Sequence, residues 1–151
     1  MSINVGLIGL GKIGAFYDIN SDNVISHIKA IIKDKRLNLE FVYDPNRNVT
    51  KKINEKYKLN NIYHDLEELK KTDANIDLIT IASPTTKHLE SIELSLDLFQ
   101  PKMILCEKPI SNNLENAKRI QSLSSKKDVN FALNFMRRSL PVFKGLKNTL
   151  D

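Results

Sequence analysis

The sequence has one cysteine, five glycines in 151 residues and no hydrophobic run of the roughly 18 residues that a membrane-spanning helix needs. A single cysteine, Cys106, excludes a disulfide-stapled fold and a multi-cysteine zinc site, and it suits the reducing cytoplasm. The N-terminus lacks the basic segment of a secretory signal peptide. We therefore expect a cytoplasmic protein without membrane contact. Its content of 41% hydrophobic and 27% charged residues is typical of a folded globular domain.

Positive charge is in modest excess and is spread along the chain. The 23 lysines and arginines outnumber the 18 acidic residues, which gives a net charge of +5. Lysines occur at most in pairs, whereas nucleic-acid-binding proteins usually have a basic stripe with aromatic residues between the charges. We therefore expect no nucleic-acid partner and only a mild attraction for phosphate-bearing ligands.

Short hydrophobic segments of β type alternate with amphipathic helical segments. The predicted strands are 3–8, 39–43, 62–63, 76–82, 103–106 and 130–135. Helices are predicted near 28–32, 46–58, 65–71, 89–99 and 114–123, the last with Ser111 as its N-cap. This alternation predicts an α/β fold with a doubly wound parallel sheet. In such sheets ligands bind outside the carboxyl ends of the strands. Four prolines lie at or just beyond those predicted ends: Pro45, Pro84, Pro109 and Pro141.

Four of the five glycines lie between positions 6 and 14. Three of them form a G-x-G-x-x-G motif directly after the first predicted strand, with Lys12 and Ile13 between the last two. Gly9 permits a tight turn, Gly11 lets the backbone approach a pyrophosphate, and Gly14 lets a helix pack closely on the strand. The motif predicts a dinucleotide site in a Rossmann-like fold, and a glycine-rich turn without a ligand is the alternative.

Asp44 ends the second predicted strand, where an acid accepts the ribose hydroxyls of an adenosine and repels a 2′-phosphate. This favours NAD, with NADP as the alternative because Arg47 follows closely. Asp44 lies 30 residues after Gly14, where about 20 is usual. The polar stretch 18–23 is interpreted as an insertion that explains why this spacing is longer than usual. The other interpretation of Asp44 is the N-cap of the helix predicted over 46–58.

Two further motifs follow later predicted strands, and they are Ser83-Pro84-Thr85-Thr86-Lys87-His88 and Glu107-Lys108-Pro109. With the glycine motif and Asp44, in this order, they make residues 3 to about 143 similar to the Gfo/Idh/MocA family. That family is named after glucose–fructose oxidoreductase, inositol dehydrogenase and a rhizopine-catabolism protein. The segment 134–141 also resembles the family's crossing into a second domain, with Arg138 at the characteristic arginine.

The resemblance implies an oxidoreductase that transfers hydride between a nicotinamide cofactor and a hydroxyl carbon of a sugar, cyclitol or related substrate. Lys108 is the implied catalytic residue, near the nicotinamide and the reacting hydroxyl, with Glu107 beside the cofactor ribose and holding Lys108 in place. Pro84 and Thr85 are expected along the dinucleotide path, with His88 as a brace of that loop. The expected cofactor-binding residues are Gly9, Gly11, Lys12, Ile13, Gly14, Asp44, Ser83, Pro84, Thr85, His88, Glu107, Lys108 and Pro109.

Members of this family carry a second domain that provides substrate contacts and the usual oligomer interface. We therefore expect a dinucleotide-binding domain over 1–136 and the start of a second domain, otherwise absent or truncated, over 137–151. The first helix of that domain would span 143–150. A small sugar-like substrate would require the second domain, so we do not expect turnover by this chain alone. A homo-oligomer is a further expectation from the resemblance.

Two other protein classes share the glycine motif, namely non-catalytic NAD-sensing regulatory modules and S-adenosylmethionine methyltransferases. Neither class has a reason to carry the tripeptide that begins at Glu107. No metal site is expected, because His27 and His64 have no partners at metal-ligand spacing, and His27 is interpreted as a brace of the domain. Cys106 falls in a predicted buried strand and is expected to be an inert core thiol.

Overall fold

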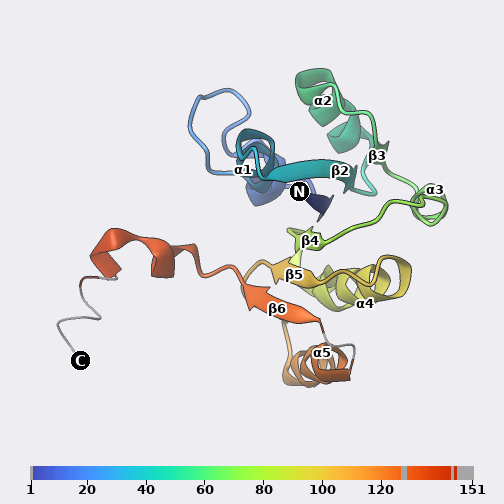
Figure 1. Ribbon diagram of the computed structural model, residues 1–151, viewed down its shortest axis with the longest axis vertical. Helices are drawn as coiled ribbons and strands as arrows, with labels where there is room; N and C mark the ends of the chain where they lie inside the picture. The colour runs from blue at the N-terminus through green and yellow to red at the C-terminus, as the bar shows by residue number, and fades with distance from the viewer. Residues whose placement is uncertain (1, 127–128, 144, 146–151) are drawn as a thin grey trace.

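In the computed structural model, which describes residues 2–126, 129–143 and 145, six parallel strands form one sheet (Figure 1). The strands are β1 (Ile3–Ile8), β2 (Leu37–Tyr43), β3 (Ile62–Tyr63), β4 (Leu78–Ile81), β5 (Met103–Cys106) and β6 (Asn130–Leu133). Their order across the sheet is β3-β2-β1-β4-β5-β6. The strand order therefore reverses at β1, and the predicted doubly wound, Rossmann-like fold is confirmed.

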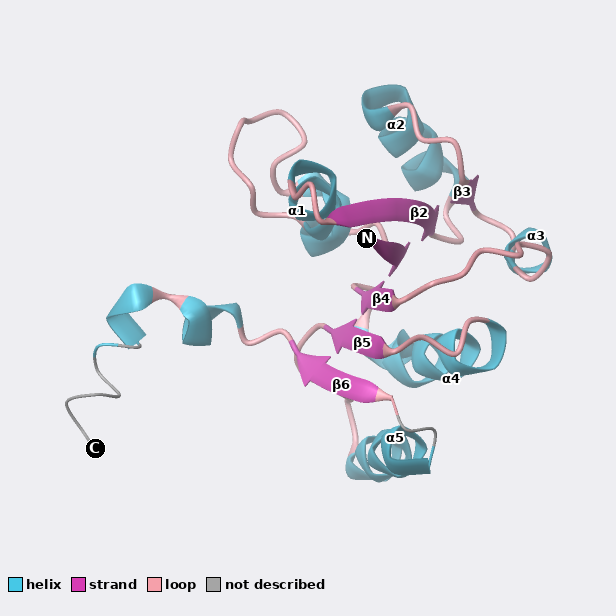
Figure 2. Cartoon of the chain, viewed as in Figure 1, coloured by secondary structure: helices cyan, strands magenta, loops and turns pink. Residues whose placement is uncertain are grey.

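Helices cover both faces of this sheet (Figure 2). One face packs against α1 (His27–Lys33) and α2 (Arg47–Tyr57), and the other packs against α4 (His88–Leu98) and α5 (Leu114–Lys126). The connections hold α3 (Leu66–Leu69) and the short helices η1 (Lys12–Phe16), η2 (Thr85–Lys87) and η3 (Met136–Ser139). Each face has its own hydrophobic core, centred on Ile28 and Ile53 on one side and on Ile92 and Ile120 on the other. None of the helices described is long and apolar enough to cross a membrane.

The second and fourth predicted strands differ from the observed strands at their ends. The second begins two residues earlier, at Leu37, because Leu37 pairs with Ile3 of β1. The fourth is shorter than 76–82, since Ile76 and Ala82 lie outside β4. Both residues are buried, with 3% and 7% of their surface exposed. Their hydrophobic character therefore reflects packing beside the sheet and not strand pairing.

Two predictions in the C-terminal half are wrong. Asn113, not Ser111, caps α5, because its Oδ1 accepts a hydrogen bond from the amide of Asn116 at 2.8 Å. Ser111 lies too far before the helix, and its hydroxyl accepts from the amide of Asn113 instead. The last strand ends at Leu133, and η3 follows it. Pro141 therefore does not lie at the end of a strand.

The stretch 18–23, interpreted above as an insertion, forms part of an irregular loop between η1 and α1 (Figure 1). Asp18 is buried in this loop with 1% of its surface exposed. Its carboxylate accepts hydrogen bonds from the amides of Ile25 and Ser26 at 2.6 and 2.8 Å. The two ends of the loop are thus tied together, which fixes the position where α1 begins.

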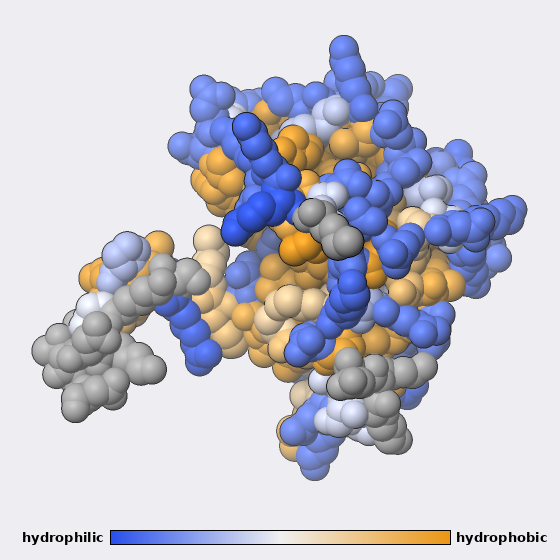
Figure 3. Space-filling view, viewed as in Figure 1, coloured by the Kyte–Doolittle hydropathy of each residue, from blue (hydrophilic) through white to orange (hydrophobic). Residues whose placement is uncertain are grey.

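The chain leaves the sheet after β6 and extends away from the body of the domain (Figure 1). In its described part this segment carries both hydrophobic and hydrophilic side chains (Figure 3). Met136, Leu140 and Val142 are 55%, 47% and 62% exposed. The helix predicted over 143–150 lies almost entirely outside the described residues.

Candidate functional site

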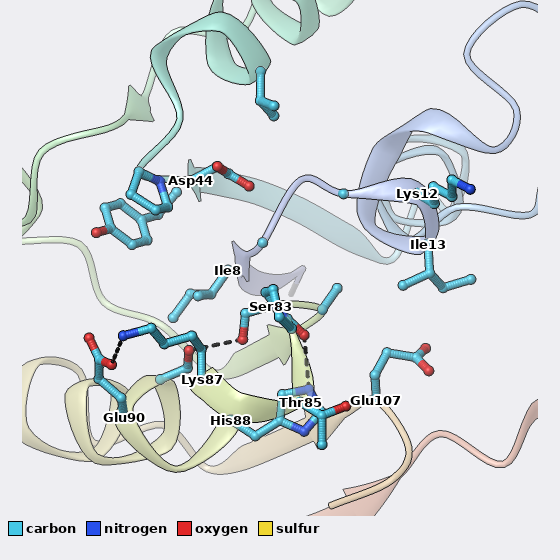
Figure 4. A pocket seen from close by; sticks show the side chains of 18 of the residues that line it. Ile8, Lys12, Ile13, Asp44, Ser83, Thr85, Lys87, His88, Glu90 and Glu107 are labelled. Carbon is cyan, nitrogen blue, oxygen red and sulfur yellow. Dashed lines mark hydrogen bonds and ion pairs between the residues drawn. The ribbon is translucent and has the colours of Figure 1, made fainter. Parts of the chain in front are cut away.

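A groove of about 1030 Å³ runs along the carboxyl ends of β1, β2, β4 and β5 (Figure 4). It contains most of the residues that the sequence suggested, namely Gly9, Gly11, Lys12, Ile13, Asp44, Ser83, Pro84, Thr85, His88, Glu107 and Lys108. Gly14 and Pro109 do not line it. The topology thus joins four separate motifs in one place, where ligands of doubly wound folds bind.

The three glycines of the motif differ in what surrounds them. Gly9 has a φ of +93°, and a Cβ there would lie 2.3 Å from the amide nitrogen of Ser83. A Cβ on Gly14 would lie 2.2 Å from the carbonyl oxygen of Gly9. A Cβ on Gly11 would meet no atom within 4 Å. The packing of the protein itself therefore requires Gly9 and Gly14, whereas Gly11 leaves open space over the groove, as a closely approaching ligand needs.

Asp44 lies at one end of the groove and is bound by backbone amides. Its Oδ2 accepts from the amide of Leu10 at 2.8 Å and its Oδ1 from the amide of Asn46 at 2.9 Å. The carboxylate therefore ties the glycine turn to the start of α2. Asn46 is the N-cap of that helix, with its side chain accepting from the amides of Asn48 and Val49. The interpretation of Asp44 as the cap is thus wrong, because Asn46 already occupies that position.

Hydrophobic side chains surround the Asp44 end, and sequence reasoning had not assigned them to the site. They are Tyr43, Pro45, Val49, Leu66 and Leu94. Burial raises the pKa of Tyr43, and the nearby carboxylates of Glu90 and Asp44 raise it further. In the sequence these residues are indistinguishable from ordinary strand, turn and helix positions. Arg47, the candidate for a 2′-phosphate, is not among the groove-lining residues.

His88 connects the loop after β4 to the segment after β5. It is 1% exposed, and its Nε2 donates to the carbonyl oxygen of Ser83 at 2.9 Å. Its Nδ1 lies 3.3 Å from the carbonyl oxygen of Ile110. The hydroxyls of Ser83 and Ser91 lie 3.0 Å apart. The loop after β4 and the segment after β5 are thus joined through one buried ring.

Glu107 lies at the other end of the groove and is only 9% exposed. Its Oε1 accepts from Nε2 of His27 at 2.8 Å and from Nδ2 of Asn134 at 2.5 Å. Burial alone would raise the pKa of Glu107, but the hydrogen bonds from His27 and Asn134 outweigh it, and the pKa is lowered. His27 braces the domain, as the sequence suggested, whereas nothing in the sequence marked Asn134 as part of this group.

Lys108 is exposed on the wall of the groove. Within the described part of the chain its ammonium has no ion-pair partner, and the Glu107 carboxylate binds His27 and Asn134. The expected role of Glu107 in holding Lys108 in place stays a prediction. The Lys108–Pro109 peptide bond is cis. With three donors and no partner among the described residues, this ammonium is available to hydrogen-bond an oxygen in the groove.

The thiol of Cys106 lies directly before Glu107 and is fully buried. Burial and the charge of Glu107 raise its pKa to about 12. The thiol therefore stays protonated and unreactive at neutral pH. In the described ranges no group of three or more His, Cys, Asp and Glu side chains is placed to hold a metal ion.

The strand order and the groove together define a dinucleotide-binding α/β domain. Residues 3–135 match the model of the oxidoreductase family with an NAD-binding Rossmann fold. The chain therefore belongs to the Gfo/Idh/MocA family of oxidoreductases, of which it represents the NAD-binding domain. This match supports the oxidoreductase prediction and gives no support to the regulatory-module alternative.

Known relatives are longer than this chain. Myo-inositol 2-dehydrogenase of Thermotoga maritima is 30% identical over 152 residues, which is 99% of this chain and 41% of that enzyme. The crystal structure of a probable dehydrogenase from the same organism has a TM-score of 0.76 at 29% identity. The matched region covers 98% of this chain and 40% of the dehydrogenase chain. An NADP⁺-dependent D-xylose 1-dehydrogenase of Haloarcula marismortui is 27% identical over 89 residues, 59% of this chain and 24% of that enzyme. The chain thus spans at most about two fifths of their length.

Proposed function

We propose that this chain binds NAD along the groove and acts in an oxidoreductase for a hydroxyl carbon of a sugar or cyclitol. The observation that carries the proposal is the single groove that joins Asp44, the open space over Gly11, and the Glu107-Lys108 pair. Relatives that act on inositol and on xylose support the substrate class. When bound, NAD supplies the hydride acceptor or donor, and the protein supplies binding and orientation.

Asp44 is the proposed ligand of the adenosine ribose. Each of its oxygens accepts one backbone amide, and each carboxylate oxygen has a second lone-pair site that can accept a ribose hydroxyl. Its negative charge opposes a 2′-phosphate, and Arg47 does not line the groove to offset that charge. We therefore infer a preference for NAD over NADP. The hydrophobic side chains of Tyr43, Leu66 and Leu94 suit an adenine ring at this end.

Gly11 and Lys12 are the proposed neighbours of the pyrophosphate. Without a Cβ at Gly11, phosphate oxygens reach the backbone of the turn, and the exposed ammonium of Lys12 adds positive charge at the groove. At the other end, Lys108 is the proposed catalytic residue. In carbonyl reduction its Nζ donates a hydrogen bond to the substrate oxygen and gives it the proton that completes the hydroxyl group, and in the reverse, oxidative direction the same proton returns to Nζ.

Titration of the chain with NADH and with NADPH, followed by thermal unfolding, tests the binding proposal. A ligand at 100 times its dissociation constant stabilises the folded state by about 2.7 kcal/mol, so NADH is expected to raise the melting temperature clearly. S-adenosylmethionine is the negative control. The variant Gly11→Val is expected to fold and to lose the NADH response. If neither nicotinamide nucleotide shifts the transition, the proposal fails.

The variant Asp44→Asn tests the preference for NAD. It removes the charge and keeps one carboxamide oxygen as an acceptor for a backbone amide. We expect NADH affinity to fall. We also expect the ratio of NADH affinity to NADPH affinity to fall about tenfold, which corresponds to about 1.4 kcal/mol. Arg47→Ala serves as the control. If this variant lost more affinity for NADPH than for NADH, the inferred preference for NAD over NADP would be reversed.

The catalytic part of the proposal is tested with Lys108→Ala in the protein as its gene encodes it. Turnover of a panel of cyclitols and sugars with NAD⁺ is followed through NADH formation, and NADH affinity is measured in parallel. We expect turnover to be lost and NADH affinity to be kept. Lys118→Ala is the lysine control, because this exposed residue lies on α5 and does not line the groove. Unchanged turnover in Lys108→Ala would remove this residue from the mechanism.

A further inference from the structure

Charged side chains are screened to different degrees along the groove. Near the Asp44 end, the ammonium of Lys87 and the carboxylate of Glu90 lie 2.7 Å apart and offset each other. At the other end, Glu107 is 9% exposed, whereas Lys12 and Lys108 are exposed to water. Charges in water are strongly screened, and a buried charge acts through a lower effective dielectric constant. Apart from its hydrogen-bonded partner His27, Glu107 is thus the least exposed charged group among the described residues at its end of the groove.

This carboxylate is also held in one place and in its ionised form. His27 and Asn134 both donate to Oε1, from α1 and from the segment after β6. These two hydrogen bonds, the coulombic effect of His27 and the backbone amide of Lys108 lower the pKa of Glu107 despite its burial. Neither partner is itself among the groove-lining residues, whereas Glu107 is. A fixed negative charge therefore acts on whatever occupies this part of the groove.

The proposed function determines which part of NAD lies there. Asp44 accounts for the adenosine ribose and the glycine turn for the pyrophosphate, so the nicotinamide half is left with the part of the groove between Ser83 and Glu107. Asp44 and Glu107 lie at opposite ends of the groove, with Ser83 between them (Figure 4). The nicotinamide ring carries a formal positive charge when oxidised and none when reduced. The two redox forms are otherwise nearly identical.

We propose that the Glu107 carboxylate makes this domain bind NAD⁺ more tightly than NADH. The inference rests on the proposed function, because it requires NAD in the groove. The attraction acts on the oxidised ring alone, so it strengthens NAD⁺ binding and leaves NADH binding largely unaffected. A preference of this kind favours release of NADH after oxidation of a hydroxyl substrate.

Dissociation constants of NAD⁺ and NADH, measured by calorimetry on the 151-residue chain, test this proposal. The decisive variant is Glu107→Gln, which removes the charge and keeps a carbonyl oxygen for His27 and Asn134. We expect the ratio of the NADH to the NAD⁺ dissociation constant to fall about fivefold, as the loss of one partly screened charge pair implies. Glu107→Asp keeps the charge and is expected to keep a ratio above one.

Glu90→Gln is the matched control, because it removes a carboxylate from the opposite end of the same groove. The adenosine half is the same in both redox forms, so any change in affinity applies equally to both and the ratio stays constant. An unchanged ratio in folded Glu107→Gln would overturn the proposal. If that variant does not fold, the wild-type chain decides, since tighter binding of NADH than of NAD⁺ overturns the proposal directly. Failure of the wild type to bind either form would instead contradict the proposed function.

Discussion

At the Asp44 end of the groove the carboxylate is held by two backbone amides, whereas at the Glu107 end it is held by two side chains. Any residue at positions 10 and 46 except proline supplies the amides that bind Asp44. The two side-chain donors of Glu107, His27 and Asn134, can be replaced only by donor side chains of suitable length. His27 lies 80 residues from Glu107 in the sequence. The first end thus depends on the backbone path and the second on the identity of distant residues.

The glycine turn shows the strongest dependence on the backbone path, and Gly14→Ala tests it with the largest expected effect. The added Cβ would lie 2.2 Å from the carbonyl oxygen of Gly9, so the turn must shift. We expect a loss of about 3 kcal/mol or more in the free energy of unfolding, measured by urea denaturation, because strain and overpacking give the largest single-residue effects.

Gly11→Ala is the matched control for this experiment, because its Cβ would meet no atom within 4 Å. The free energy of unfolding is expected to change by no more than about 0.5 kcal/mol. NADH affinity is expected to fall at least tenfold, since the methyl group occupies the open space. Equal destabilisation by the two substitutions would show that both glycines serve packing and would remove the distinction between them.

The side-chain network at the other end is tested by His27→Ala. Among the described residues, the substitution leaves the buried Glu107 carboxylate with Asn134 as its one remaining side-chain donor. Loss of a partner of a buried charged group costs about 1–3 kcal/mol, so we expect a destabilisation of that size in thermal or urea unfolding. Glu107→Gln is expected to reduce the cost of His27→Ala in a double-mutant cycle. Additive effects in that cycle would show that the two residues do not interact energetically.

This difference between the two ends also explains what the sequence could predict. The alternating segments, the roles of Gly9 and Gly14 and the position of Asp44 follow from local patterns, because strand periodicity and steric limits on the backbone act over few residues. The contact between His27 and Glu107 depends on the side-by-side placement of β1, β4 and β5 and on the path of the loop that Asp18 closes. No local pattern marks such a contact. Asn134 and the hydrophobic lining at Tyr43 were missed for the same reason.

Asn46→Ala tests the contribution of the Asp44 end to the free energy of unfolding. It is expected to destabilise the protein less than His27→Ala does at the Glu107 end. The substitution removes the N-cap of α2, whose side chain accepts from the amides of Asn48 and Val49. It leaves the amide that binds Asp44 in place. We expect a loss of about 1 kcal/mol in the free energy of unfolding. A loss larger than that of His27→Ala would contradict the view that the side-chain network is the more sensitive of the two ends.

The pH dependence of stability offers the smallest and most specific test. Hydrogen bonds outweigh burial at both Glu107 and Asp18, so the pKa of each is lowered from its ordinary value of 4.5 or 3.8. Protonation is then more favourable in the unfolded state, and stability falls as the pH drops below these ordinary values through the folded pKa values. We expect the free energy of unfolding to be nearly constant between about pH 7 and 5 and to decline toward pH 3.

Glu107→Gln and Asp18→Asn are each expected to flatten this decline, because each removes one group that gains protons on unfolding. Asn46→Ala removes no titratable group, so it is expected to shift the whole pH profile by a constant amount. The measurement is urea denaturation at several pH values between 3 and 7. If Glu107→Gln declined as steeply as the wild type, the Glu107 carboxylate would not be stabilised by His27 and Asn134 in solution. The contrast between a backbone-held and a side-chain-held carboxylate would then lose its energetic basis.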